Sequence, residues 1–220
     1  MRSLREPVSA LTHSLGALLS VLGLIILLAE AIGNDSVRQV VAFSIFGGSL
    51  VAMYSVSAFY HSFNFSERGI AQLRRIDHMM IYVLIAGTYT PVCLLLLPEP
   101  LGLVLLSTVW ALATIGTAMK IVWMDSPIWI STALYLGLGW IAVVLIKPLL
   151  AVAPTGFFLW ILAGGLFYSI GAVVHALKWP RPSTTERPLV FGSHEIWHLF
   201  VMAGSFCHYW AILAYATRVR

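Results

Sequence analysis

Charged residues are scarce in this sequence, and their scarcity limits the kinds of protein it can encode. Asp, Glu, Lys and Arg together make up only 10% of its 220 residues, whereas an ordinary soluble domain carries about 25%. Hydrophobic residues make up 60%, and the mean hydropathy is +0.90. A soluble globular domain is therefore excluded, and the composition predicts an integral membrane protein.

Cysteine is also rare, since the chain has only Cys93 and Cys207, and both fall inside apolar stretches. A disulfide framework is excluded, because such residues are usually small buried thiols. The net charge of +4 is modest, and the basic residues stand at the ends of apolar segments without interleaved exposed aromatic residues. Nucleic acid is therefore not an expected partner, and the charge is better interpreted as membrane topology.

Apolar stretches long enough to cross about 30 Å of hydrocarbon recur along the whole chain. The first is longer than the apolar core of a signal peptide, which has about 7–15 residues, and it is interpreted as an uncleaved helix. We expect an all-α polytopic membrane protein: one seven-helix transmembrane domain over residues 1–220. Its predicted spans are 8–31, 38–63, 76–97, 101–122, 127–147, 155–177 and 193–216.

The distribution of basic residues predicts the orientation of these spans. One side of the membrane receives Arg2, Arg5, Arg68, Arg74, Arg75, Lys120, Lys178, Arg181 and Arg187. The other side receives only Arg38, Lys147, Arg218 and Arg220. Because basic residues favour the cytoplasmic side, the N-terminus is predicted in the cytoplasm and the C-terminus outside.

Histidines gather in one layer of this predicted topology. His194 and His198 stand four residues apart at the start of the last span, so both imidazoles lie on one helix face. His61 ends the second span at the same depth. A catalytic zinc takes three protein ligands and keeps a fourth position for water, so these three residues predict a metal site near the cytoplasmic leaflet.

Two further polar residues occupy the same layer and are the predicted catalytic groups. Asp77, at the start of the third span, can accept a proton from water at the metal. Ser57 is one helical turn before His61 and can orient that water or hold a substrate carbonyl oxygen. The alternative for Asp77 is a salt-bridged helix start beside Arg74 and Arg75. The full set predicts a metal hydrolase site.

Other residues near this layer admit different interpretations. His194-Glu195-Ile196-Trp197-His198 also fits the H-E-x-x-H motif of zinc proteases, in which the glutamate is the general base. The only later histidine, His208, would lie about 21 Å along the helix from His194, too far to share a metal with it. Glu195, His78 and His13 are instead expected to support the site from behind the ligands. The alternative is a structural role, in which an isolated intramembrane histidine makes an interhelical hydrogen bond. It applies to His13, His78, His175 and His208.

The motifs of the chain resemble the hemolysin III proteins, the bacterial branch of the progestin and adipoQ receptor family. The resemblance covers essentially the whole chain, and Glu6 and His13 are similar to the N-terminal pattern of the bacterial members. It rests on Ser57-Ala58-Phe59-Tyr60-His61, Arg75-Ile76-Asp77-His78, Ile85-Ala86-Gly87-Thr88-Tyr89-Thr90-Pro91 and His194-Glu195-Ile196-Trp197-His198.

The resemblance implies a seven-helix protein of the bacterial plasma (inner) membrane with an intramembrane zinc. By kinship with the receptors and alkaline ceramidases, it implies zinc on His61, His194 and His198, water activation by Asp77 and an accessory role for Ser57. Imidazole suits several divalent ions, so the preference for zinc rests on this resemblance. It also implies a membrane lipid as substrate or ligand.

Three functions follow as hypotheses. The first is a zinc-dependent hydrolase of lipid amide or ester bonds with a role in membrane lipid homeostasis. The second is a non-catalytic receptor or sensor of membrane state in which zinc ties the last span to the second. The third, suggested by the hemolysin label, is a cytolytic pore, for which the sequence offers no polar stripe through a full span.

Overall fold

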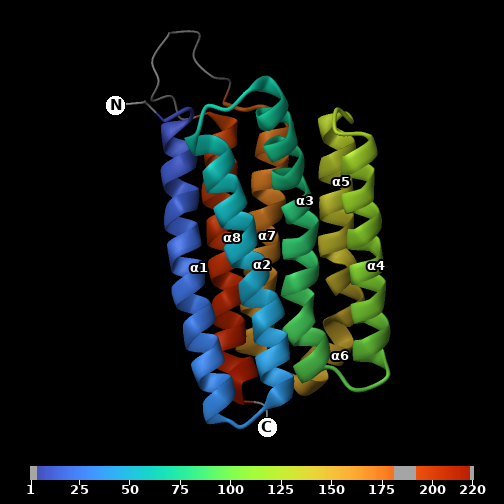
Figure 1. Ribbon diagram of the computed structural model, residues 1–220. Helices are drawn as coiled ribbons and strands as arrows, with labels where there is room; N and C mark the ends of the chain where they lie inside the picture. Colours follow the sequence, from blue (N-terminus) through green and yellow to red (C-terminus); the bar gives the residue numbers. More distant parts are fainter. Residues whose placement is uncertain (1–3, 181–191, 219–220) are drawn as a thin grey trace.

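The protein is a bundle of membrane-length helices (Figure 1). The computed structural model describes residues 4–180 and 192–218. Within them, seven helical segments are long and apolar enough to cross a membrane, and the described residues contain no strand. The all-α fold predicted from the sequence is therefore confirmed. The chain enters at one end of the bundle and finishes at the other (Figure 1); which end faces the cytoplasm stays a prediction.

The helices follow one another with short connections. In chain order they are α1 (Pro7–Gly33), α2 (Val37–Ser62), α3 (Glu67–Pro91) with a π-helical continuation η1 (Val92–Leu96), α4 (Leu101–Val122), α5 (Ile128–Trp140), a 3₁₀ segment η2 (Ile141–Leu145), α6 (Ile146–Val152), α7 (Thr155–Ala176), α8 (Ser193–Tyr215) and a final 3₁₀ turn η3 (Ala216–Arg218).

Helix α3 begins at Glu67, well before the start near residue 76 that hydropathy suggests. The cause is local, because the Ser66 hydroxyl accepts a hydrogen bond from the Gly69 backbone N–H at 3.3 Å and caps the helix. Glu67 adds a negative charge in the first turn, where the helix dipole favours it. The polar turns of α3 thus extend the apolar span, and Asp77 lies within the helix rather than at its start.

The predicted fifth span is interrupted. Helix α5 gives way to the 3₁₀ segment η2 at Ile141, and α6 resumes the span at Ile146. The Tyr89 hydroxyl of α3 meets this break: it accepts from the Ala142 N–H at 2.7 Å and lies 2.5 Å from the Gly139 carbonyl oxygen. A side chain from a neighbouring helix therefore satisfies backbone groups where the helical ladder changes, as an apolar medium requires.

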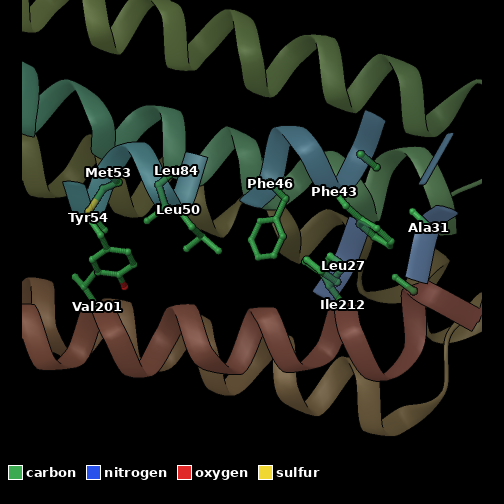
Figure 2. Packing of buried hydrophobic residues seen from close by; sticks show 12 residues of the cluster. Leu27, Ala31, Phe43, Phe46, Leu50, Met53, Tyr54, Leu84, Val201 and Ile212 are labelled. Atoms are coloured by element: carbon green, nitrogen blue, oxygen red, sulfur yellow. The ribbon is translucent and has the colours of Figure 1, made fainter. Parts of the chain in front are cut away.

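The densest packing lies between α1, α2, α3 and α8. Phe43, Phe46 and Leu27 have no exposed surface, and Figure 2 shows them in a row with Leu50, Tyr54 and Ile212 between the facing helices. Small residues permit this approach. At Gly16, for example, an added Cβ would come within 2.6 Å of the Tyr54 ring. This packing fixes α2 and α8 relative to each other.

Candidate metal centre

Three histidines from α2 and α8 converge inside the bundle. One ring nitrogen from each of His61, His194 and His198 lies within 4.8 Å of the other two. The Nε2 atoms of His61 and His194 are 3.4 Å apart. His61 and His198 are almost fully buried, at 1% and 2% exposure. Residues separated by more than 130 positions thus form one cluster, as the sequence predicts.

Glu6, immediately before α1, fixes the orientation of one member of the cluster. Its Oε2 lies 2.5 Å from Nδ1 of His61. Because a carboxylate can only accept, Nδ1 carries the proton and Nε2 keeps its lone pair, directed to the cluster. Burial alone would raise the pKa of the Glu6 carboxyl, but the hydrogen bond from His61 and the charge of Arg5 outweigh it and lower that pKa.

This arrangement fits a divalent metal ion. Tetrahedral coordination with metal–nitrogen bonds of about 2.0–2.1 Å places ligand nitrogens about 3.3 Å apart, close to the 3.4 Å between His61 and His194. Histidine ligands commonly donate their second ring N–H to a carboxylate, as His61 does to Glu6. Nδ1 of His198 is buried and has no hydrogen-bond partner among the described residues. The group can hold a metal ion, and the geometry alone does not select which one.

Asp77 and Ser57 lie beside this cluster. The Asp77 carboxyl lies within electrostatic range of His61, and Asp77 and Ser57 both line the cavity that borders the cluster. Its side chain is only 14% exposed, and its ionic contact among the described residues is His78, at 3.9 Å. Arg74 pairs with Asp125 instead, at 3.4 Å. This geometry favours Asp77 as part of the site over the salt-bridged helix start.

The contacts of the Glu195 side chain differ from those that the general base of the protease motif would require. Its Oε2 accepts from the Gly192 backbone N–H at 2.9 Å and thereby caps the first turn of α8. Its Oε1 accepts from the Ser9 hydroxyl at 3.1 Å, which ties α8 to α1. Both oxygens are therefore occupied by structural contacts, and the motif serves as a helix start here.

His13 and His78 contact the site differently. The His13 ring stacks on His198 with centroids 3.6 Å apart, and neither of its ring nitrogens has a partner among the described residues. Nδ1 of His78 donates to the Arg74 carbonyl oxygen at 2.8 Å, within α3. In the described part of the chain, neither imidazole therefore makes the interhelical hydrogen bond considered for these histidines, although the His78 backbone carbonyl accepts one from Tyr135 of α5.

The two remaining histidines lie outside the ligand group. His208 donates from Nε2 to the Ile161 carbonyl oxygen on α7, at 3.0 Å, which is the interhelical bond considered from the sequence. The His175 ring is 5.4 Å from the His194 ring, centroid to centroid, and its Nδ1 has no partner among the described residues. His175 therefore borders the cluster, while His208 is a packing residue.

A cavity of about 730 Å³ opens beside the histidines. Its walls come mainly from α2, α3, α5, α7 and α8, with further residues from α4 and α6, and its lining is largely apolar between the histidine cluster and the turn that follows α4. It extends from His194 and Asp77 past Ile85 and Leu136 to Leu149 on α6. The volume is in the range of sites for small organic ligands.

Two features of the site carry weak signals in the sequence. Glu6 precedes a proline and an apolar run, so only its similarity to the bacterial pattern marks it, and its bond with His61 is long-range. The position of Lys120 near the end of an apolar segment predicts an interfacial charge. The structure instead shows it 1% exposed and lining the cavity. The local sequence around a cation four residues from a turn does not predict that the cation is buried.

The comparisons with known proteins agree with the fold. The model of the family described as Haemolysin-III related matches residues 1–209. The chain is 40% identical to "Hemolysin-3" of Bacillus cereus over 96% of this chain and 91% of that protein. It is 37% identical to the "Hemolysin-3 homolog" of Bacillus subtilis (strain 168), over 97% and 95% of the two chains.

A more distant similarity extends to eukaryotes. The chain is 27% identical to the human "Monocyte to macrophage differentiation factor" over 87% of this chain and 76% of that protein. With the near-complete match to the bacterial proteins and seven membrane-length helices, these similarities place it among multi-pass proteins of the bacterial plasma membrane. The chain belongs to the haemolysin-III-related family, of the progestin and adipoQ receptor type.

Proposed function

We propose that this protein is a zinc-dependent hydrolase that cleaves an amide or ester bond in a membrane lipid and contributes to membrane lipid homeostasis. One observation carries the proposal: three histidines that can share a metal, two of them buried, lie at one end of a largely apolar cavity, with a carboxyl that is only 14% exposed beside them. A purely structural metal needs neither the cavity nor the carboxyl.

The chemistry divides between the ion and the chain. A zinc ion bound by His61, His194 and His198 supplies a Lewis acid that polarises a carbonyl and makes water more acidic. Asp77 accepts the proton of the attacking water and delivers it to the leaving group. Ser57, next to Asp77, orients the carboxyl. The apolar walls hold the acyl chain and exclude bulk water from the reacting carbonyl.

Fatty-acid release from defined lipids tests the proposal. The purified chain is reconstituted with one amide-linked and one ester-linked lipid, and released fatty acid is measured by mass spectrometry. The matched pair is His194→Ala and His208→Gln, because both histidines lie on α8 but only His194 belongs to the cluster. We expect release by the wild type and by His208→Gln. Equal release by His194→Ala would contradict a metal-dependent reaction.

The printed name of the Bacillus relatives suggests a second function, membrane damage. Leakage of a trapped dye from liposomes containing the protein measures it directly. We expect no leakage above that of empty liposomes, because the cavity of this chain is largely apolar rather than a polar channel. The sensor alternative predicts no fatty-acid release but a lower thermal stability once the metal is removed.

A further inference from the structure

Lys120, at the end of α4, is an unusual group to find buried. It is 1% exposed, and its Nζ donates to the Ser131 hydroxyl at 2.6 Å and to the Ser126 hydroxyl at 3.0 Å. Among the described residues, no carboxylate forms an ion pair with it. The nearest acidic residue in sequence, Asp125, is 85% exposed and pairs with Arg74. The ammonium is therefore buried with no direct ion pair among the described residues, and the exposed Asp125 carboxylate offsets its charge only from a distance.

Burying an ammonium without a counter-charge is costly, and two hydroxyl contacts compensate for only part of that cost. An ammonium has three N–H donors, and two of them are used here. The two serine hydroxyls hydrogen-bond to each other at 3.1 Å, which uses one of their protons and leaves the other free to be donated. The group thus presents unused donors around a positive charge, which is the chemistry that binds an oxyanion.

Other basic groups surround the same end of the cavity. Arg74 and His78, one helical turn apart on α3, line the cavity together with Lys120. Both lie within electrostatic range of Lys120. Lys120 and Arg74 thus place two cationic side chains where the cavity reaches the turn between α4 and α5, and the only ion pair that either forms among the described residues is the exposed one between Arg74 and Asp125. An anion in the cavity would supply a counter-charge to Lys120.

The position of this group relative to the metal centre is informative. The turn between α4 and α5 lies at the same end of the bundle as the start of α1 (Figure 1), and Glu6 at that start contacts His61. The cavity runs from this end toward α6 between largely apolar walls. A ligand that fills it has a charged group at this end and an apolar tail along the bundle.

We propose that Lys120, Ser126 and Ser131, with Arg74 beside them, form a subsite for the phosphate of an anionic lipid whose acyl chain occupies the cavity. This inference rests on the proposed function in taking the same cavity as the substrate cavity, and it narrows the substrate class to phosphate-bearing lipids. A free phosphate ion shares the headgroup chemistry, and the experiment separates the two sources. The competing explanation is a structural one, in which Lys120 only stabilises the turn between α4 and α5 through its hydrogen bonds to the two serines.

Native mass spectrometry of the full chain in an uncharged detergent tests the subsite by binding rather than by turnover. The probes are hexadecyl phosphate, hexadecanol and inorganic phosphate. None contains an acyl bond, so the proposed hydrolase cannot consume them. Lys120→Gln removes the charge, Lys120→Arg keeps it, and Arg38→Gln removes an exposed charge that pairs with Glu99 on the opposite side of the bundle.

We expect the wild type, Lys120→Arg and Arg38→Gln to bind hexadecyl phosphate at least about tenfold more tightly than hexadecanol. Lys120→Gln should lose this preference. Retention of the full preference by a folded Lys120→Gln protein would overturn the subsite. Displacement of hexadecyl phosphate by equimolar inorganic phosphate would overturn its assignment to a lipid headgroup.

Two variants keep the test decisive. If Lys120→Gln does not fold, Ser131→Ala replaces it, since it removes one hydroxyl and leaves the charge. We expect Ser131→Ala to weaken the binding of hexadecyl phosphate severalfold. If the group only stabilised the turn between α4 and α5, the substitution would instead lower the melting temperature and leave the preference for hexadecyl phosphate intact. His194→Ala should bind hexadecyl phosphate as the wild type does, so failure of the subsite and failure of the metal-dependent reaction are separable.

Discussion

The two sides of the bundle are packed to different degrees. Half of the residues in the most apolar stretch of α2 are buried, against 17% in the span formed by α5, η2 and α6. Gly87, on α3, faces Ser49 of α2 so closely that an added Cβ would lie 2.2 Å from its hydroxyl oxygen. At Gly137 and Gly139 of α5, an added Cβ would meet no atom within 4 Å.

This difference separates two tasks. A metal centre needs ligands held within fractions of an ångström, and α2 and α8, which supply them, belong to the densely packed side. The proposed substrate cavity needs space, and the cavity lies against α5, the loosely packed helix interrupted by η2. The fold thus places rigid ligands and an adaptable wall on opposite sides of one cavity. The following predictions test this division.

The largest expected effect is chemical. Asp77→Asn should lower lipid turnover by about 10²–10⁴-fold, because it removes the proton acceptor while keeping the shape of the side chain. Metal content and melting temperature should stay near those of the wild type. Fatty-acid release per bound metal is the measurement. Undiminished release would remove Asp77 from the mechanism and return it to a structural role.

The next effect concerns the dense side. Phe46→Ala should destabilise the protein by about 3 kcal/mol, because Phe46 is fully buried and its loss leaves a cavity between packed helices. Leu134→Ala on α5, where the side chain is 41% exposed, should cost about 0.5 kcal/mol or less. Unfolding of both variants in mixed micelles gives the comparison. Equal losses would show that the two sides are equally packed.

A third prediction addresses the support of the ligands. Glu6→Gln should weaken metal binding by about 10–100-fold, since it removes the carboxylate that holds the His61 ring. Glu30→Gln is the control, because Glu6 immediately precedes α1 and Glu30 lies near the opposite end of that helix. Competition with a chelator reports both affinities. An unchanged affinity in Glu6→Gln would mean that packing alone orients His61.

The smallest effects come from single methyl groups. Gly87→Ala should destabilise the protein by about 1–3 kcal/mol, because the new Cβ has no room against Ser49. Gly137→Ala should be neutral or stabilising by up to about 1 kcal/mol, since it gains helix propensity without a clash. The melting temperatures of the two variants, compared with that of the wild type, measure both effects. A destabilising Gly137→Ala would place an unseen contact on the α5 face.

The sequence predicts the fold and the grouping of His61, His194 and His198 for identifiable physical reasons. Apolar length determines the spans, and the four-residue spacing of His194 and His198 determines a shared face. Its predictions are poorer where contacts are long-range. Nothing local to Glu6 indicates its bond with His61, and nothing local to Lys120 indicates that α5 covers it. The interruption at η2 depends on Tyr89, a residue from another helix.

Metal content per chain tests the central claim most directly. The protein is purified without chelators, and elemental mass spectrometry is applied to the wild type, His61→Ala, His194→Ala and His208→Gln. We predict about one zinc per chain in the wild type and in His208→Gln, and none in the other two variants, because α2 and α8 share one ion. Zinc retained by either His61→Ala or His194→Ala would contradict a centre built from both helices.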